Sequence, residues 1–356
     1  MDVVIYVFIN FVLIINALWY NSEQLFVVQV RKCFMEKLDI LYTVDSNYFV
    51  HFLTSVHSLL ENNKESFICL HVIEDNLTLF DRKLLDELVS IYNNIDLKVY
   101  TWDFTKEKYV IPKWRGTNIA NARLFSREIL KDVNKVLYLD SDTIVDGSIA
   151  NLFNRESTNP VGAVLDFNVP YHLKSVIDNY FNSGVLFFDY KVWDEEDCTK
   201  TMYDTFKENT IPLVFPDQDL LNLSMSYKID MLNMSYNVTP LIYDMLKYPF
   251  FTKKTLTKKN YYTFEEIVDT SNNPIIYHML SYFNERPWDF NNKHPFNQVY
   301  QSYRQSWDRS FELVSSGNYD LLTNFMGYVN MMFNSFLPDS INSEIKERVR
   351  KLYKKV

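Results

Sequence analysis

The sequence predicts an α/β fold with a mostly parallel central sheet flanked by helices. Short apolar runs with the length of buried strands alternate with amphipathic stretches that have helical spacing. This alternation is typical of a parallel sheet whose strands are joined by crossover helices. Two of the apolar runs end in an aspartate, Asp45 and Asp140. In such sheets ligands bind beyond the carboxyl ends of the strands, so both aspartates are candidates for a site.

The expected elements follow one another in a regular order. Strands are expected at 38–45, 66–75 and 95–103, and helices at 47–61, 78–92 and 118–130. A further buried strand at 136–139 precedes Asp140, and later strand candidates are 161–167 and 183–190. Residues 240–275 are expected to be more irregular, and the chain beyond 295 is expected to be helical.

The composition sets limits on the class of protein. The chain is 47% hydrophobic and 16% aromatic, which is enough for a sizeable core. Its net charge of -9 argues against a nucleic-acid partner that would need a wholly basic surface. The three cysteines, Cys33, Cys69 and Cys198, are too far apart for a disulfide framework, so a reducing, cytoplasmic location is expected. Glycosylation sequons, expected to be chance occurrences, begin at Asn76, Asn222, Asn233 and Asn237.

The two ends of the chain differ from the rest. Residues 3–19 are almost wholly apolar, so 1–34 is either a membrane segment or a non-native extension upstream of a start at Met35. Residues 291–356 are expected to form a helical region with a basic tail. A solvated helix is the favoured interpretation of this tail, and contact with an anionic membrane surface is the alternative.

The stretch VLYLDSD contains a pair of aspartates, Asp140 and Asp142, directly after an apolar run. Residues two apart in an extended segment share a side, so both carboxylates should point the same way. Two such charges repel, and a bound cation would resolve the conflict. Carboxylate oxygens suit Mg²⁺ or Mn²⁺, commonly shared with substrate phosphates. The alternative for the pair is an ordinary surface loop.

Six blocks of this sequence together resemble family 8 glycosyltransferases, which include glycogenin-like and bacterial lipopolysaccharide-type galactosyl- and glucosyltransferases. They occur in the family's order, over roughly 38–290: LYTVDSNY (41–48), the Arg of NARL (121–124), VLYLDSDTIV (136–145), YFNSGVLFFD (180–189), PDQDLLN (216–222), and IIYH (275–278) followed by RPW (286–288). The resemblance implies a GT-A fold, a UDP-sugar donor, Mn²⁺ dependence and retention of anomeric configuration. It also makes 35–290 the expected catalytic domain.

The resemblance assigns donor-binding roles to residues at the end of the first strand. Asp45 would accept the N3–H of uracil, with Thr43, Asn47 and Tyr48 around the base and Tyr48 stacked on it. Without the resemblance, Asp45 would be interpreted as a cap of the following helix.

Further donor contacts are implied for Arg123, Asn182 and Gly184. Arg123 would lie near the donor sugar and the two aspartates, although Asn121 stands where the family often has an aromatic residue. Asn182 would bind the sugar, and Gly184 would allow close approach of the backbone to a ligand. The alternatives are a surface salt bridge for Arg123 and an ordinary turn at 182–184.

Three further positions complete the implied site. Asp217 would bind sugar hydroxyls and Gln218 would lie close to the anomeric carbon in a positioning role, although a helix start explains both residues equally well. His278 would join Asp140 and Asp142 in the metal shell. Arg286, which stands in place of a lysine, would bind the diphosphate, after a loop (279–285) that differs from the family pattern.

The function implied is a metal-dependent, retaining transfer of a hexose from UDP-glucose or UDP-galactose to a glycan, lipid-linked or protein acceptor. It would take place in the cytoplasm or at the inner face of the membrane.

Two alternative functions use the same residues: a haloacid-dehalogenase-like, Mg²⁺-dependent phosphohydrolase with Asp140 as nucleophile, and a degenerate sugar-nucleotide-binding protein. A sugar-nucleotide pyrophosphorylase would need a Gly-rich loop, and 40–60 contains no glycine.

Overall fold

The computed structural model describes most of the chain between residues 35 and 315. The described residues are 35–101, 111–113, 116–167, 169–170, 173–259, 262–281, 285–308, 310–313, 315, 328–329, 332–333 and 336. The expectations for 1–34 and for the basic tail lie outside them. Within these ranges, none of the helices combines the length and the hydropathy needed to span a bilayer.

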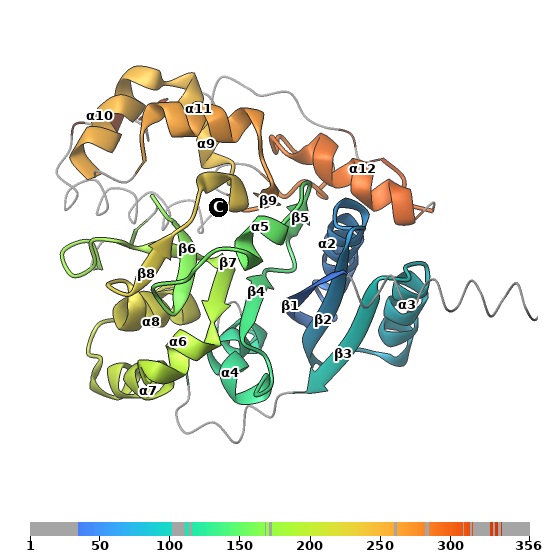
Figure 1. Cartoon of the computed structure of the whole chain (residues 1–356). Helices are drawn as coiled ribbons and strands as arrows, with labels where there is room; N and C mark the ends of the chain where they lie inside the picture. The colour runs from blue at the N-terminus through green and yellow to red at the C-terminus, as the bar shows by residue number, and fades with distance from the viewer. Residues whose placement is uncertain are drawn as a thin grey trace, which may run out of the picture.

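A seven-stranded sheet forms the centre of the molecule (Figure 1), in the order β3-β2-β1-β4-β7-β6-β8. Its strands are β1 (Glu36–Asp45), β2 (Ser66–Asp75), β3 (Ile95–Thr101), β4 (Lys135–Leu139), β6 (Val161–Leu165), β7 (Phe181–Asp189) and β8 (Ile229–Met231). The neighbours from β3 to β4 are parallel, and so are β6 and β8, whereas β7 runs antiparallel to β4 and β6. The predicted α/β fold with a mostly parallel sheet is confirmed.

In the chain, α-helices lie between most of these strands. They are α2 (Phe49–Asn62), α3 (Leu79–Ser90), α4 (Ser126–Ile129), α5 (Ala150–Phe153), α6 (Tyr190–Glu195), α7 (Cys198–Glu208), α8 (Pro216–Met225), α9 (Leu241–Lys247), α10 (Pro249–Lys259), α11 (Phe264–Asn272) and α12 (Asn297–Trp307). The last eight residues of β1 are all buried, as expected of a strand covered on both faces. Helix α12 lies beside α2 (Figure 1), where Trp307 donates to the Thr54 hydroxyl and Ser306 contacts His57.

Two regions differ from the sequence expectations. Residues 118–130 form a 3-10 helix, η2 (Ile119–Phe125), and then the single turn α4, instead of one α-helix. The segment 240–275 is helical rather than irregular, because it contains α9, α10 and α11, which pack on one another (Figure 1). A capping box of Thr263 and Glu266 starts α11, and this signal is present in the sequence.

A second, two-stranded sheet brings distant segments together. Strand β5 (Thr143–Val145) directly follows the aspartate pair and runs antiparallel to β9 (Ile276–His278). The register places Thr143 opposite His278. This pairing therefore sets His278 beside Asp142, although the two residues are far apart in the sequence.

Candidate active site

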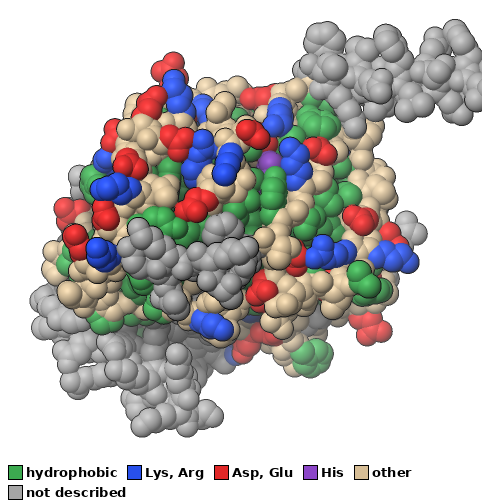
Figure 2. Space-filling view, turned by 90° about the horizontal axis from the view of Figure 1, so that it is seen from below, with side chains coloured by type: hydrophobic (Ala, Val, Ile, Leu, Met, Phe, Trp, Pro, Cys, Tyr) green, Lys and Arg blue, Asp and Glu red, His purple; other side chains and the backbone are tan. Residues whose placement is uncertain are grey.

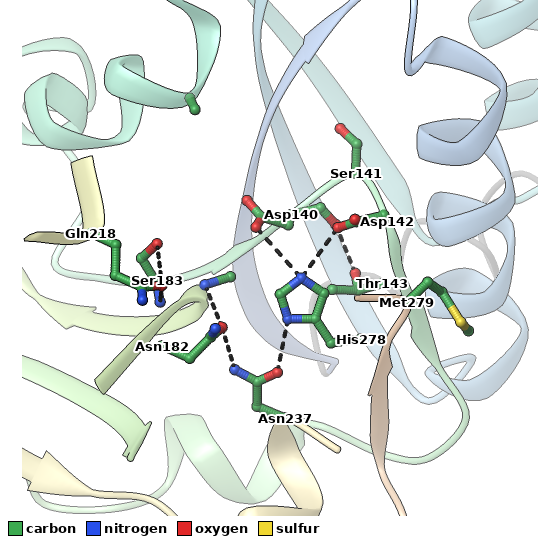
Figure 3. A network of polar contacts seen from close by, with 12 residues as sticks. Asp140, Ser141, Asp142, Thr143, Asn182, Ser183, Gln218, Asn237, His278 and Met279 are labelled. Atoms are coloured by element: carbon green, nitrogen blue, oxygen red, sulfur yellow. Dashed lines mark hydrogen bonds and ion pairs between the residues drawn. The ribbon is translucent and has the colours of Figure 1, made fainter. Parts of the chain in front are cut away.

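The two aspartates lie in a tight turn between β4 and β5. Strand β4 ends at Leu139, so the extended alternation that predicted a shared side does not continue through Asp142. The turn instead directs both side chains to one place (Figure 3). It is held by the Asp140 N–H, which donates to the Gly184 carbonyl at 2.8 Å, and by the Met279 N–H, which donates to the Asp142 carbonyl at 2.9 Å.

Asp140, Asp142 and His278 form a compact group, named here the carboxylate–histidine cluster. One ligand atom from each lies within 4.8 Å of the others, and no other group of this kind occurs among the described residues. The His278 Nε2 atom is 3.2 Å from Asp142 Oδ1 and 3.6 Å from Asp140 Oδ2. The three residues predicted as metal ligands are thus brought together.

The chemistry of this cluster fits a divalent cation. His278 Nε2 is fully buried and has no hydrogen-bond partner. The other ring nitrogen, Nδ1, is 3.0 Å from the Asn237 side-chain oxygen, an acceptor that favours a proton on Nδ1. In the neutral ring Nε2 then presents a lone pair to two carboxylate oxygens that are also acceptors. A cation held between the three groups would give Nε2 a partner and would bind both carboxylates, and oxygen with imidazole ligands suits Mn²⁺.

Arg123 lies at the centre of a second group, named here the guanidinium cluster, with Asp217, Ser183 and Gln218. Its guanidinium is buried, 2.9 Å from Asp140 and 3.2 Å from Asp217, and donates to the Ser183 carbonyl at 2.6 Å. Burial acts to lower the pKa of Arg123, but the nearby carboxylates outweigh it and raise the pKa above its ordinary value. Burial raises the pKa of Asp217, and Arg123 opposes that rise. Arg123 is therefore a buried ionic link and not a surface salt bridge.

Asp217 and Gln218 of the guanidinium cluster are positioned by the start of a helix. Pro216 opens α8, as the sequence indicated, and the first turn presents Gln218 toward β7. The Gln218 side-chain oxygen accepts the Ser183 N–H at 2.9 Å, and its amide donates to the Tyr180 hydroxyl at 2.9 Å. Tyr180 in turn donates to Asp219 at 2.6 Å. Gln218 is thus held in one orientation beside Ser183 (Figure 3).

The predicted base-binding residues lie at the end of β1. The Asp45 carboxylate accepts the N–H groups of Asn47 at 3.0 Å and Tyr48 at 3.2 Å, in the turn that leads into α2. Thr43 is 3.0 Å from the Tyr138 hydroxyl, which donates to Asp140 at 2.7 Å. The end of β1 is therefore linked to the carboxylate–histidine cluster through Tyr138.

Arg286 contacts the carboxylate–histidine cluster through Asp142. It donates to Asp142 at 2.6 Å and also to the Met279 carbonyl. Burial acts to raise the pKa of Asp142, but that pKa lies well below its ordinary value, and the Arg286 guanidinium is the strongest influence that lowers it. The Trp288 ring lies 5.5 Å from the Arg286 guanidinium and 6.2 Å from the Tyr48 ring. Tyr48 and Arg286 therefore border one region, although 282–284 of the intervening loop lie outside the described residues.

Sequence reasoning missed three residues that organise this site. Tyr138 lies two residues before Asp140 and links it to Thr43, a position that strand alternation would have indicated. Ser183 connects Arg123 with Gln218. Asn237 contacts His278, and the sequence gives no signal for this role beyond a glycosylation sequon.

Asn222 and Asn237 are both buried with bonded side chains, so neither is an exposed acceptor for glycosylation.

A small hollow lies beside Asn182 and Asn237, of which Asn237 contacts His278 of the carboxylate–histidine cluster. Its polar side is formed by Asp166, Asn182, Asn237 and Thr239, and apolar residues such as Leu241 and Ile242 form the rest.

The face shown in Figure 2 carries acidic and basic side chains interspersed over its described part, which does not resemble a nucleic-acid-binding surface.

Comparison with known proteins decides the family. The model of glycosyl transferase family 8 matches residues 39–291, which is most of the chain. This chain belongs to glycosyl transferase family 8. The expected resemblance is confirmed, and family membership decides against the phosphohydrolase and pyrophosphorylase alternatives.

Relatives and solved structures agree with this family 8 assignment. A lipopolysaccharide 1,2-glucosyltransferase of Escherichia coli is 30% identical over 57% of this chain and 62% of its own length. General stress protein A of Bacillus subtilis (strain 168) is 28% identical over 76% of this chain and 94% of its own length. The structure of the galactosyltransferase LgtC with donor and acceptor sugar analogues aligns with a TM-score of 0.61 at 22% identity, over 76% of this chain and 96% of LgtC. That likeness confirms the predicted GT-A fold.

Proposed function

We propose that this chain is a hexosyltransferase that moves glucose or galactose from UDP-glucose or UDP-galactose to a saccharide acceptor and retains the anomeric configuration. The reaction uses a divalent cation, with Mn²⁺ preferred and Mg²⁺ as the alternative. The observation that carries the proposal is the unpartnered Nε2 of His278, which faces Asp140 and Asp142 in a chain of this family.

In this proposal Asp140, Asp142 and His278 hold the cation. When bound, the cation neutralises the charge that develops on the departing diphosphate. The imidazole ligand favours Mn²⁺ over Mg²⁺, because nitrogen suits the softer ion. Arg286 adds a positive charge to the same oxygens, and its present contact with Asp142 at 2.6 Å supports this placement.

The donor's other parts bind on either side of the cluster. Asp45, Thr43, Asn47 and Tyr48 take the uracil, with the Tyr48 ring stacked on the base. Asn182 and Gly184 lie at the start of β7 on the sugar side, together with the guanidinium cluster.

Arg123, Asp217 and Gln218 act on the sugar by positioning it. Their mutual bonds support this role, because an oriented set of donors and acceptors costs no reorganisation when charge develops at the anomeric carbon. The Gln218 side-chain oxygen already accepts the Ser183 N–H, so we assign it no role as a nucleophile. The acceptor hydroxyl would attack on the face from which UDP leaves.

The acceptor is a glycan, free, lipid-linked or attached to protein. The printed name of the Escherichia coli relative supports a lipopolysaccharide-type acceptor. We also propose a cytoplasmic location, supported by the free, buried thiols of Cys69 and Cys198.

The first experiment is UDP release from a panel of UDP-sugars with Mn²⁺, Mg²⁺ or EDTA, with p-nitrophenyl phosphate as the phosphatase control. Release from UDP-glucose or UDP-galactose that depends on Mn²⁺ is expected, because such enzymes hydrolyse their donor slowly without an acceptor. Tight Mn²⁺-dependent UDP binding without release would point to a strict acceptor requirement or to a binding protein. Absence of both release and UDP binding would contradict the proposal.

A further inference from the structure

A series of buried hydrogen bonds runs from Asn182 on β7 through Asn237 to His278 of the carboxylate–histidine cluster (Figure 3). The Gly184 N–H donates to the Asn182 side-chain oxygen at 3.0 Å. The Asn237 amide nitrogen donates to that same oxygen at 2.9 Å. The Asn237 oxygen then faces Nδ1 of His278 at 3.0 Å. All four residues are buried, so no bond in this chain is readily exchanged with water.

The proton positions along this chain follow from a single backbone group. A backbone N–H can only donate, so the Asn182 atom that it meets must be the oxygen. Asn237 must then present its NH₂ group to Asn182, which leaves its oxygen for His278. That oxygen can only accept, so His278 Nδ1 must carry a proton. The second amide contact agrees, because the Asn182 NH₂ group donates to the Asp166 carboxylate at 3.1 Å.

We propose that Asn237 is a positioning residue that fixes His278 in its Nδ1–H tautomer and so makes Nε2 a cation ligand. The inference rests on the proposed cation dependence of the site. The neutral ring could otherwise place its proton on Nε2, where it would bond to Asp142 and block the ligand position. Outer partners of this kind fix the tautomer and the orientation of a metal-binding histidine.

Gly184 supports the same arrangement by a second route. A Cβ atom at this position would lie 2.1 Å from His278 Cε1 and 2.8 Å from Asp140 Oδ2. Only glycine therefore leaves room for the His278 ring against β7. Its N–H sets the direction of the hydrogen bonds from Asn182 to His278. The same residue fixes both where the ring lies and which nitrogen carries the proton.

The direct test is the tautomer of His278 in the full chain, freed of metal with EDTA. Long-range ¹H–¹⁵N spectra of ¹⁵N-histidine-labelled protein would be recorded at alkaline pH. The His278 signal would be assigned by its loss in His278→Gln. An Nδ1–H signal is expected for the natural chain, and an Nε2–H form or a mixture for Asn237→Ala. An Nε2–H signal in the natural chain would overturn the proposal.

The second test is the affinity for Mn²⁺ alone, measured from the free-ion EPR signal. Asn237→Ala is expected to weaken binding by about 10- to 100-fold. Asn94→Ala is the matched control, because Asn94 is equally buried, with bonds to the Asn63 and Ser66 carbonyls at the opposite ends of the strands. Asn94→Ala is expected to lower the melting temperature but to leave Mn²⁺ affinity unchanged. Unchanged affinity in folded Asn237→Ala would refute the role of Asn237.

Asn237→Asp separates tautomer control from packing. Its carboxylate still accepts the Nδ1 proton, but it cannot donate to the Asn182 oxygen, which it would repel. We expect it to keep the Nδ1–H tautomer and more Mn²⁺ affinity than Asn237→Ala, in spite of a lower melting temperature. Equal loss of affinity in both variants would mean that Asn237 acts only structurally. If the natural chain bound no Mn²⁺, the proposed function would fail, and the tautomer spectrum would still decide this inference.

Discussion

Two groups of polar side chains meet at Asp140, and they differ in how their atoms are satisfied. In the guanidinium cluster Arg123 bonds to Asp140, Asp217 and the Ser183 carbonyl. In the carboxylate–histidine cluster the Nε2 lone pair of His278 faces oxygens of the same polarity and has no hydrogen-bond partner. Buried polar networks are stable only when every member has a partner. The first cluster therefore keeps its shape by itself, whereas the second contains a buried nitrogen without a hydrogen-bond partner, which the proposed cation would satisfy.

The largest effect should come from removing a ligand from the incomplete cluster. Asp142→Asn is expected to reduce Mn²⁺-stimulated UDP release by at least about 100-fold, because losing a ligand costs no less than losing a group that orients one. The matched control is Asp230→Asn, since Asp230 bonds to Thr158 and Asn159 away from this site. Full turnover in a folded Asp142→Asn protein would disprove the metal assignment.

Removing the central residue of the guanidinium cluster should mainly reduce the stability of the protein. Arg123→Met leaves Asp140 and Asp217 without their buried partner and is expected to lower the free energy of unfolding by about 3–5 kcal/mol. Lys200→Met, which breaks the exposed pair with Asp204, should leave the urea midpoint unchanged. Equal midpoints for the two variants would show that Arg123 does not hold the site together.

The close packing of Gly184 against His278 and Asp140 can be tested by substituting this glycine. Gly184→Ala places a methyl group against His278 and Asp140 and should cost about 1–3 kcal/mol of stability, with loss of Mn²⁺ binding. Gly147→Ala is the control, because its Cβ would meet only Ile275, at an ordinary 3.4 Å. Calorimetric melting with and without Mn²⁺ measures both quantities. Tight Mn²⁺ binding by Gly184→Ala would contradict the placement of the His278 ring.

The smallest effect concerns how stability depends on pH. Because burial raises the folded-state pKa of Asp217, the native state keeps this proton to higher pH than the unfolded chain does. Stability relative to Asp217→Asn should therefore fall as the pH rises above about 4 toward that raised pKa.

At Asp39 burial also acts to raise the pKa, but His71 and Lys37 outweigh burial and lower the pKa of Asp39. Stability relative to Asp39→Asn should therefore be lost as the pH falls below about 4.

Urea unfolding of both variants and the natural chain across this range measures the two slopes. Slopes of the same sign at Asp39 and Asp217 would contradict the different environments of the two carboxylates.

Local sequence patterns predicted the elements that depend on neighbouring residues. The strands β1, β2 and β7 and the helices α2 and α3 lie close to the expected ranges, because continuous apolar runs and helical spacing are local signals. The helices of 240–275 were missed even though α11 has a clear capping box. At η2 the tertiary structure overrides the helical pattern, because Arg123 turns inward to Asp140 and the Ser183 carbonyl.

The sequence by itself determined the order of the strand and helix segments along the chain, the aspartate pair after β4 and, through its resemblance to a family, the candidate residues of the site. Only the tertiary structure decided that His278 meets Asp142, that Arg123 is buried, and that Asn237 contacts the imidazole. The reason is physical. Strands as short as β5 and β9 carry little local signal, and their register depends on contacts between segments that only the folded chain brings together.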